Sequence, residues 1–501
     1  MKKQNSLRYL VLALIFASIF SLNSMPGLAQ AINRWPPPQR IPNFVDDTNP
    51  PYLIADQNGT VHAFTSQRIG DDGKEVAIIY NQWTSQKGWT KPIDVILSPL
   101  KDQARLLGAF LDQKGMMHII FFGGDETEAN IYYTKAAAVQ AKQTQAWLAP
   151  LAIGKNALVP ETGAIAGDNQ GHLIVVYGGD ADGKGLYFIT SADGGDTWTD
   201  PTPFFFTFSE YVWPTSLQMY LGQSGWLHVV WNIDDKTGQG RGVYYAHLKV
   251  GETEWSEPFV LAKVDAGLGT KTPTIIEHKD TVFALFYNAN TGGHLTFRRS
   301  TDEGVSWSEP ITPFPQIGMN GAGSFVVDSN QELHLFFGQR LTGEPDFHGM
   351  WHSLLRGGNW VAPEPVVSGP RVTDETGDTS FDPIEAKAVD SQGNLLLVTW
   401  RTDYCCKANG VWYSYKALNA PQLPLIPLPV QFTLAATLTV PTAIPVDLTA
   451  TPTVSPVSEQ LNNTPFKSVG GPTISLIMGI GPAILFVSIV AAYRFSRYRR
   501  F

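Results

Sequence analysis

The feature that most constrains the fold of this chain is a short motif, Trp-x-x-Pro, that recurs along most of its length. Seven copies start 51 to 58 residues apart, whereas chance pairing of 14 Trp with 35 Pro in 501 residues would give about one. A period near 50 residues is typical of solenoids and β-propellers, in which each repeat is one unit packed on its neighbours. The copies start at Trp35, Trp89, Trp147, Trp198, Trp255, Trp307 and Trp360.

Each repeat contains the same succession of predicted strands. A short strand leads into a turn such as Asp56–Gly59 or Asp112–Gly115. A continuous apolar run follows, which is typical of a strand buried on both faces. An aromatic strand and the Trp strand complete four strands per repeat, which make one propeller blade. The apolar runs are Val61–Phe64, Met116–Phe122, Leu173–Tyr177, Leu227–Trp231, Val282–Tyr287, Leu333–Phe337 and Leu395–Trp400.

The two ends of the repeat predict how the ring closes. The last inner strands, near residues 382–415, have no Trp-x-x-Pro after them, and the first copy, Trp35–Pro38, has no inner strands before it. If the N-terminal strand becomes the outer strand of the last blade, no sheet edge stays exposed. We therefore predict an all-β propeller of four-stranded blades over residues 32–420. Seven blades are expected, or six if one degenerate unit is miscounted.

Two repeats carry a longer motif, Ser-x-Asp-x-Gly-x-x-Trp, at their outermost turn. In such a turn the Asp accepts hydrogen bonds from backbone N–H groups, the Gly takes a positive φ, and the Trp holds the turn on the blade. The motif resembles the Asp-box of the sialidase-like (BNR-repeat) β-propeller superfamily. The resemblance implies the propeller fold and a structural role for these residues. They are Ser191, Asp193, Gly195, Trp198, Ser300, Asp302, Gly304 and Trp307.

The blade geometry also predicts where a ligand should bind. The first and third turns of a four-stranded antiparallel blade lie at one end, and the second turns and the links between blades lie at the other. The Asp-boxes occupy third turns, so the polar second turns form the opposite face, where we expect any ligand site; the alternative for each residue is a solvated loop charge. Strand register places Arg105 and Glu161 at the mouth of the central channel on that face. The candidates are Arg105, Glu161, Arg68, Arg340, Arg401, Asp403 and Tyr404.

The resemblance leaves two functions open. Sialidases hold the substrate carboxylate with three arginines and use a Tyr nucleophile backed by a Glu, with an Asp as acid/base. This chain has an Arg40-Ile41-Pro42 triplet similar to the family's first-arginine motif, but Gly59 follows nineteen residues later instead of about ten. No catalytic residue can be assigned from spacing. The chain is therefore interpreted as a surface recognition module for a glycan or a protein, with an exo-α-sialidase-type glycoside hydrolase as the alternative.

The remaining polar residues predict no metal or cofactor. His62, His118, His228 and His334 share one register on the buried strands, as packing residues do. Cys405 and Cys406 lie in the second turn of the last blade. They form either free thiols or a strained vicinal disulfide, because adjacent Cα atoms about 3.8 Å apart fall below the usual disulfide span. A net charge of −9 argues against nucleic acid as a partner.

The two ends of the chain predict the compartment. Residues 1–31 combine a basic start, an apolar run and an Ala-x-Ala site, as in a secretory signal peptide, with an uncleaved anchor as the alternative. Residues 421–471 form a Pro/Thr-rich stalk, although Pro421–Leu434 is apolar enough to lie against the propeller.

The last part of the chain predicts a membrane anchor. Residues 472–493 lack charge and as a helix would span ~33 Å, enough to cross a bilayer. The basic tail 494–501 should stay cytoplasmic. We therefore expect a single-pass plasma-membrane protein, anchored in the lipid bilayer, with its propeller outside the cytoplasm.

Overall fold

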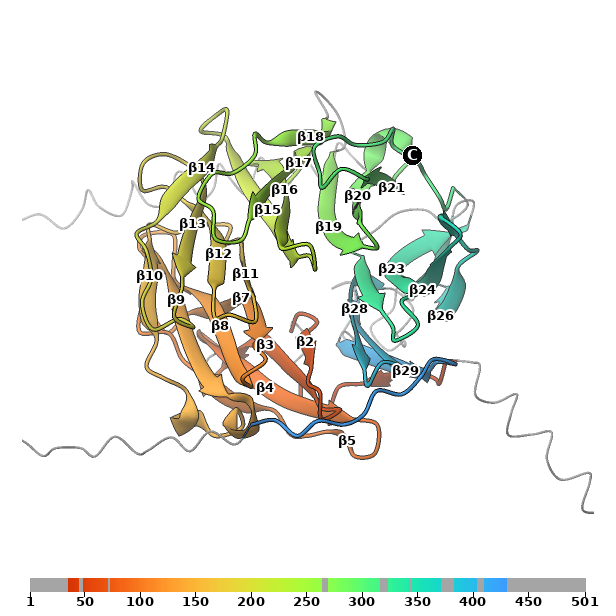
Figure 1. Ribbon diagram of the computed structural model, residues 1–501, viewed down its shortest axis with the longest axis horizontal. Helices are drawn as coiled ribbons and strands as arrows, with labels where there is room; N and C mark the ends of the chain where they lie inside the picture. The colour runs from red at the N-terminus through yellow and green to blue at the C-terminus, as the bar shows by residue number, and fades with distance from the viewer. Residues whose placement is uncertain are drawn as a thin grey trace, which may run out of the picture. The chain divides into compact units, whose positions relative to one another are not determined.

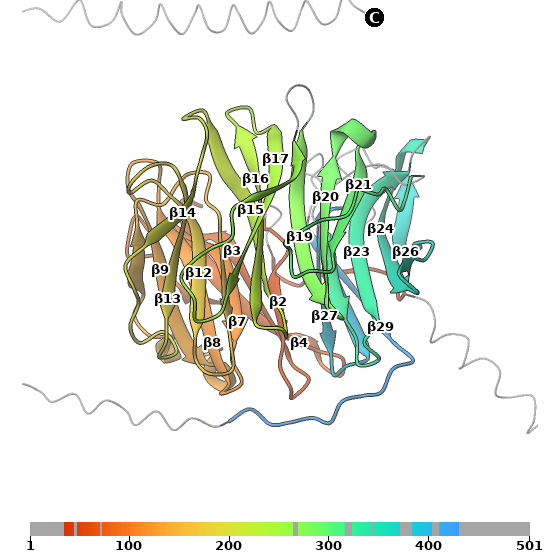
Figure 2. The same cartoon turned by 45° about the horizontal axis from the view of Figure 1, so that its top comes forward.

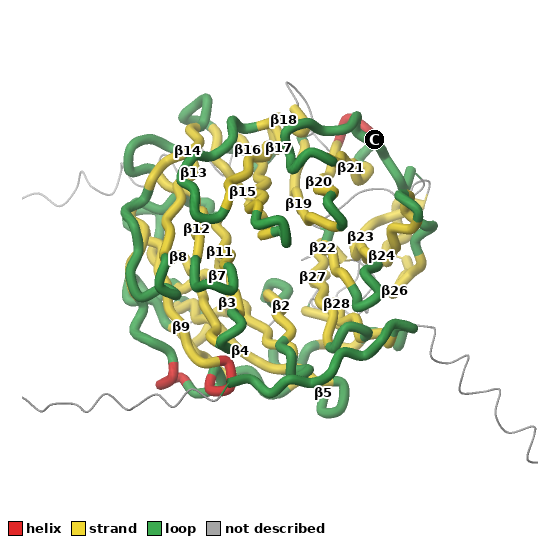
Figure 3. Tube along the Cα trace, in the orientation of Figure 1, coloured by secondary structure: helices red, strands yellow, loops and turns green. Residues whose placement is uncertain are grey.

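The computed structural model describes residues 35–44, 48–70, 73–263, 269–315, 323–341, 344–370, 383–402 and 410–429. Within these residues the chain forms seven antiparallel sheets around a central axis (Figure 1). The predicted all-β propeller is therefore confirmed, with seven blades rather than six. Figure 3 shows the first strand of each blade nearest the axis.

The first four blades follow the repeat in order. Blade 1 holds β2 (Tyr52–Ala55), β3 (Val61–Ile69), β4 (Glu75–Thr84), β5 (Gly88–Trp89) and β6 (Ile93–Ile96). Blade 2 holds β7 (Ala104–Leu111), β8 (Met116–Gly124), β9 (Ala129–Ala137) and β10 (Leu151–Lys155) with the 3₁₀ turns η2 (Ala138–Gln140) and η3 (Thr144–Ala146). Blade 3 holds β11 (Gly163–Gly167), β12 (Leu173–Gly179), β13 (Gly185–Ser191) and β14 (Thr202–Phe206). Blade 4 holds β15 (Val212–Leu221), β16 (Trp226–Asp235), β17 (Gly240–Lys249) and β18 (Phe259–Lys263).

The last three blades complete the ring. Blade 5 holds β19 (Thr270–His278), β20 (Thr281–Asn288) and β21 (His294–Ser300), with the 3₁₀ turn η4 (Ala289–Thr291). Blade 6 holds β22 (Ser324–Val327), β23 (Leu333–Leu341), β24 (Glu344–Arg356), β25 (Asn359–Trp360) and β26 (Glu364–Pro370). Blade 7 holds β27 (Pro383–Ser391), β28 (Leu395–Thr402) and β29 (Val411–Ala417), with β1 (Gln39–Arg40) as its outer strand.

The ring closes through the N-terminal strand, as the unpaired ends of the repeat predicted. Gln39 pairs with Tyr413 and Arg40 with Trp412, and the Ile41 N–H donates to the Val411 carbonyl at 2.9 Å. The Arg-Ile-Pro triplet therefore begins in the outer strand of blade 7 rather than in the first blade. The guanidinium of Arg40 lies 5.1 Å from the centre of the Trp412 ring.

The repeated Trp residues hold neighbouring blades together. Each one packs against an aromatic residue of the preceding blade, with ring centroids 4.8–5.8 Å apart. Because this contact recurs at every boundary of the ring, the motif has to recur in every blade. The pairs are Trp35–Phe336, Trp89–Tyr413, Trp147–Phe64, Trp198–Tyr133, Trp255–Phe188, Trp307–Tyr245 and Trp360–Phe297.

Blade 5 departs from the predicted four strands. Its sheet has three strands, and a single bridge between Phe297 and Ile311 stands where the fourth would pair. Pro310, Pro313 and Pro315 follow Trp307 in this segment. Proline has no backbone N–H to donate, so a longer ladder cannot form there.

The segment after the last blade lies along the propeller. The Leu423 N–H donates to the Gln392 carbonyl at 2.7 Å, and that of Ile426 donates to the Gln57 carbonyl at 2.8 Å. Leu428 then packs on the apolar cluster of blades 1 and 2. Figure 2 shows residues 421–429, in blue, running along one end of the blades.

The predicted membrane anchor lies outside the described residues, as do the signal peptide, residues 430–471 and the basic tail. Among the residues that the structure describes, no helix is long and apolar enough to cross a membrane.

Candidate functional site

The two Ser-x-Asp-x-Gly-x-x-Trp turns, which resemble Asp-boxes and are called boxes below, are held by contacts within themselves. Asp193 accepts the backbone N–H groups of Asp196 and Thr197 at 3.0 and 2.9 Å, and the Ser191 hydroxyl accepts that of Gly195 at 2.8 Å. A Cβ on Gly195 would lie 2.0 Å from the Tyr133 hydroxyl oxygen, and φ there is +86°. Only glycine fits both conditions, so the turn can approach the neighbouring blade.

The second box repeats this arrangement in blade 5. Asp302 accepts the Ser306 N–H at 2.9 Å, and Ser300 accepts that of Gly304 at 2.8 Å. Hydrogen bonds from the Ser306 hydroxyl and backbone lower the pKa of Asp302 to about 2. Both carboxylates therefore accept these hydrogen bonds from within their own turns.

The two ends of the blades differ as the strand order requires. The Gly194 N–H of the first box donates to the carbonyl of Gly171 in the first turn of blade 3, at 2.9 Å. First and third turns thus share one end, which we call the box face. The second turns and the links between blades lie at the other end, which we call the link face.

On the link face the structure brings together two of the predicted residues. Arg105 begins the innermost strand of blade 2, and Glu161 precedes that of blade 3. The Arg105 Nη1 donates to Glu161 Oε2 at 3.1 Å, and the guanidinium lies 5.8 Å from the centre of the Phe122 ring. The side chains are 38% and 28% exposed, so a ligand can reach the pair.

The other predicted residues are more scattered. Arg401, in β28, donates to the Asn49 side-chain oxygen at 2.5 Å and so ties blade 7 to the entry of blade 1. Arg68 is exposed near the end of β3. Arg340 lies in β23, and its side chain is outside the described part of the structure. Three more sets of calls fall wholly outside the described residues: Asp403, Tyr404 and the Cys405–Cys406 pair.

Other cations on the link face are bound by carboxylates. Lys101 contacts Asp125 at 2.7 Å. Arg241 donates from Nε to Asp235 Oδ2 at 2.9 Å. Together with Arg105, three cations of this face are therefore already neutralised by protein acids.

The end of β14 and the link from blade 3 to blade 4 expose three aromatic side chains. Phe206, Phe208 and Tyr211 are 51%, 65% and 62% exposed. Lys184, from the second turn of blade 3, fixes this link, because its Nζ donates to the Glu210 carbonyl at 2.5 Å and lies 4.1 Å from the centre of the Trp213 ring. We call these three residues the aromatic patch.

Sequence reasoning missed the aromatic patch, although a signal was present. The segment 204–211 contains five aromatic residues, more than the outer strand of a blade can bury. Phe204 stacks on Trp255 and Phe205 packs on Trp231. Phe206, Phe208 and Tyr211 remain exposed, and exposed apolar side chains that gather on one segment mark interaction sites.

The aligned histidines form buried hydrogen-bonded relays. In blade 1 the Nδ1 of His62 lies 2.7 Å from the Tyr80 hydroxyl, and its Nε2 lies 3.2 Å from Asp56 Oδ2. Blades 2 and 4 repeat the His–Tyr contact at 2.7 Å, through His118–Tyr133 and His228–Tyr245. These relays join the second and third strands of a blade, in keeping with the packing role expected for the histidines.

Blade 6 differs because His352 replaces the tyrosine. The Nδ1 of His334 lies 2.9 Å from His352 Nε2, and the Nδ1 of His352 lies 2.9 Å from Glu364 Oε1. Glu364 also accepts Lys416 Nζ at 2.8 Å and Trp35 Nε1 at 3.1 Å. This relay lines a cavity of about 500 Å³ between blades 6 and 7.

The protonation states of this relay follow from its surroundings. Burial opposes ionisation of Glu364, but hydrogen bonds from His352 and Lys416 outweigh it and lower its pKa to about 2. Burial and the adjacent His352 lower the pKa of His334 to about 4. Glu364 is therefore a carboxylate at neutral pH, and His334 is a neutral imidazole. The sequence shows a histidine at position 352 where blades 1, 2 and 4 have a tyrosine. Its role could not be predicted, because its partners His334 and Glu364 are known only from the structure.

Comparisons with known proteins show the fold. No model of a known protein family matches the chain, and no curated protein sequence matches it. The BP39L lectin from Burkholderia pseudomallei is 13% identical with a TM-score of 0.52, over 75% of this chain and 99% of the lectin. An ulvan lyase of polysaccharide lyase family PL25 is 13% identical with a TM-score of 0.51, over 75% of this chain and 95% of the lyase.

A sialidase-type structure is more distant. The intramolecular trans-sialidase from Ruminococcus gnavus is 14% identical, with a TM-score of 0.41 over 76% of this chain and 96% of that one. The lectin and the lyase, with TM-scores above 0.5, show a shared fold alone, and the residues have to decide the chemistry.

Proposed function

We propose that this chain is a membrane-anchored, extracytoplasmic propeller that binds a carbohydrate on its link face. The observation that carries the proposal is the aromatic patch, which is held on a fixed link of the same face as the Arg105–Glu161 pair. Sugar rings present an apolar C–H face and a rim of hydroxyl groups. Aromatic rings match the first, and charged hydrogen-bonding side chains match the second.

The surface suits a neutral or weakly charged sugar. Arg105, Lys101 and Arg241 are each paired with a carboxylate, so they offer both donors and acceptors to hydroxyl groups. Phe and Tyr lose little conformational entropy on binding, because each has two side-chain torsions. A lectin and a polysaccharide lyase that share the fold support a carbohydrate ligand over a protein one.

Binding of oligosaccharides to the purified full-length chain in detergent tests this proposal. A glycan array would select the ligand, and calorimetric titration would measure its affinity. We expect Phe208→Ala with Tyr211→Ala to weaken binding at least about tenfold, since each lost aromatic contact contributes ~1 kcal/mol. The matched control is Val305→Ala, because Val305 is 69% exposed on the box face. Unchanged affinity in the double variant would overturn the proposed site.

The membrane part of the proposal rests on the charge-free segment 472–493 and the four arginines after it. Positive residues flanking a span stay in the cytoplasm. Protease added to intact cells should therefore release a soluble propeller fragment by cutting within residues 430–471. Protection of the propeller until the cells are lysed would reverse the orientation.

A further inference from the structure

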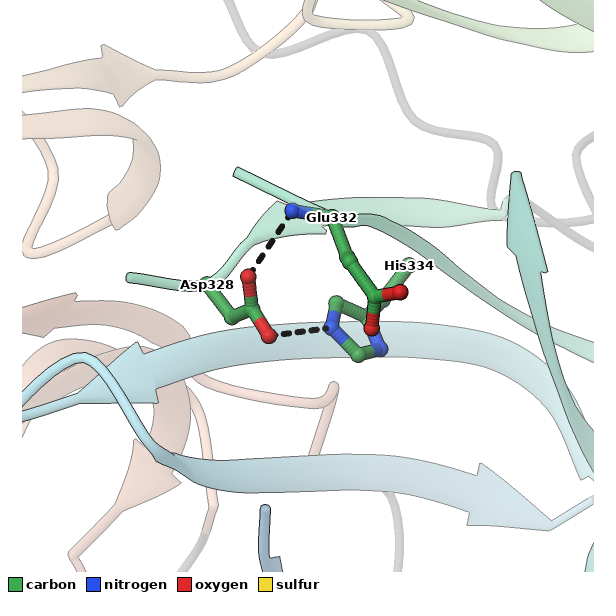
Figure 4. Close-up of side chains that lie close together, drawn as sticks. All are labelled: Asp328, Glu332 and His334. Atoms are coloured by element: carbon green, nitrogen blue, oxygen red, sulfur yellow. Dashed lines mark hydrogen bonds and ion pairs between the residues drawn. The ribbon is translucent and has the colours of Figure 1, made fainter. Parts of the chain in front are cut away.

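We propose that blade 6 binds a divalent metal ion through Asp328, Glu332 and His334. One ligand atom from each of these residues lies within 4.8 Å of the others, at the edge of the cavity between blades 6 and 7. Figure 4 shows the Asp328 carboxylate directed both to the Glu332 backbone N–H, at 2.8 Å, and to the His334 ring, at 3.5 Å. The site goes beyond the carbohydrate site, which lies on the opposite face.

The hydrogen bonds of the relay determine which nitrogen of His334 carries a proton. Glu364 is a carboxylate and can only accept, so His352 donates to it from Nδ1. The Nε2 of His352 can then accept from Nδ1–H of His334 at 2.9 Å. In this arrangement the lone pair of His334 Nε2 remains to bind a cation.

That lone pair points at a group that cannot donate. The Nε2 of His334 is buried and has no hydrogen-bond partner, and the nearest polar group is the Asp328 carboxylate at 3.5 Å. The whole residue is 1% exposed, so bulk water does not reach it freely. A lone pair facing a carboxylate in a buried site is unfavourable unless a cation lies between them.

Blade 1 shows the opposite direction of the relay. Gln82 donates to the Tyr80 hydroxyl at 2.7 Å, so this hydroxyl can donate to His62 Nδ1, which leaves the proton on Nε2 and directs it at a carboxylate. In blade 1 that carboxylate, on Asp56, lies 3.2 Å from His62 Nε2. Replacing tyrosine by His352 and Glu364 reverses the direction of the relay.

The three side chains match the preferences of a metal ion of the zinc or manganese type. Two carboxylates and one neutral imidazole balance a charge of +2 and supply oxygen and nitrogen ligands. The adjoining cavity of about 500 Å³ has room for a water molecule as a further ligand. A metal-bound histidine usually donates its other N–H to a fixed acceptor, and the His352–Glu364 pair provides one. Arg356 contacts the Glu332 carboxylate at 3.0 Å, so a bound ion has to compete with this ion pair.

Metal content of the full-length chain tests the proposal without an activity assay. The protein is stripped with EDTA, dialysed against Zn²⁺, and its bound metal counted by elemental analysis, with Co²⁺ absorption as a spectroscopic probe. We expect one ion per chain and a higher melting temperature. His352→Tyr should restore the tyrosine relay, keep the fold and weaken Zn²⁺ binding by about 10- to 100-fold.

Blade 2 supplies the matched control. His118 and Asp112 have the same 3.5 Å separation, and His118 Nε2 likewise lacks a hydrogen-bond partner, but Met116 occupies the place of Glu332, so the third ligand is missing. His118→Gln should leave the metal content unchanged, whereas His334→Gln should abolish it. If His334→Gln does not fold, Glu332→Gln replaces it as the test and should also lower the metal content. The Glu332 side chain is 33% exposed, so this change should not disturb folding. Absence of bound Zn²⁺ in the unaltered protein, or equal loss in the blade 2 control, would overturn the proposal.

Discussion

Trp35 donates its indole N–H to the Glu364 carboxylate at 3.1 Å, across 329 residues of sequence. The same ring stands edge-on to Phe336, with centroids 5.6 Å apart, and the Lys416 ammonium lies 5.5 Å from its centre. The start of the propeller is thus locked between its last two blades. Ring closure depends on this side chain as well as on the short pairing of β1 with β29.

Replacing Trp35 should therefore destabilise the whole ring. We expect Trp35→Ala to lower the free energy of unfolding by ~3 kcal/mol, as for other packed tryptophans truncated to alanine. Trp35→Phe keeps an aromatic ring but loses the hydrogen bond, and should cost less, about 1–2 kcal/mol. Denaturation in guanidinium chloride measures both. A Trp35→Ala variant as stable as the unaltered protein would show that β1 alone closes the ring.

The Asp-box carboxylates should make stability depend on acid. Hydrogen bonds from Ser306 lower the pKa of Asp302 to about 2, below the value near 4 of an unfolded chain. Because the folded-state pKa is lowered, this stabilisation is complete above about pH 4 and is lost as the pH falls through about 2. Asp302→Asn should thus melt a few degrees lower at pH 7 and no lower near pH 2. Its ligand binding should not change, because the box faces away from the link face.

The sequence predicts those features of the fold that depend on its repeated motif. The Trp-x-x-Pro period and its unpaired ends predicted the blade count, the strand order and the closure of the ring. The partner of each Trp was not predictable, because Tyr413 and Trp89 meet only once the ring has closed. The missing fourth strand of blade 5 was not predicted, because the Trp-x-x-Pro motif at Trp307 is intact. The extra prolines come after the motif and prevent the strand that would follow from pairing.

The candidate site was predictable only in part. Strand register brought Arg105 and Glu161 to one place, since Arg105 lies at the start of β7 and Glu161 just before β11, the innermost strands of adjacent blades. The aromatic patch was not predictable, because aromatic residues of a propeller are mostly core and only the packing of Phe204 and Phe205 shows which ones remain outside. The relay of blade 6 depends on Glu364, which a strand pattern cannot place.

Blade 4 offers a test of how the histidine relays stabilise the fold. It has Gly222 where the first turns of blades 1, 2, 3 and 6 have an aspartate, and Glu277 from blade 5 reaches His228 Nε2 at 3.2 Å instead. Glu277→Ala should leave the buried Nε2 of His228 unpaired and cost ~1–3 kcal/mol. Thermal or chemical denaturation would measure the loss.

The same position allows the relay to be rebuilt within the blade. A Cβ on Gly222 would lie 1.8 Å from Glu277 Oε2, so Gly222→Asp alone should be destabilising. Combined with Glu277→Ala, the new aspartate has room and restores a carboxylate. We expect the double variant to be more stable than either single one, a coupling that contacting residues show. Strictly additive losses would mean that the carboxylate does not act through His228.

The last prediction concerns catalysis. A sialic acid carboxylate needs guanidinium groups that are clustered and available, because bidentate contacts hold it in a fixed geometry. On the link face Arg105 is engaged by Glu161 and Arg241 by Asp235, so an anionic sugar has to displace a protein carboxylate from each. We therefore expect no turnover of a fluorogenic sialoside by the full-length chain, and weaker binding of its carbohydrate ligand in Arg105→Ala. Glu161→Gln removes the carboxylate that competes with a sialoside for Arg105. If the chain only binds carbohydrate, this variant should still not hydrolyse the sialoside. Sialoside hydrolysis that Arg105→Ala abolishes would instead identify the chain as a glycoside hydrolase.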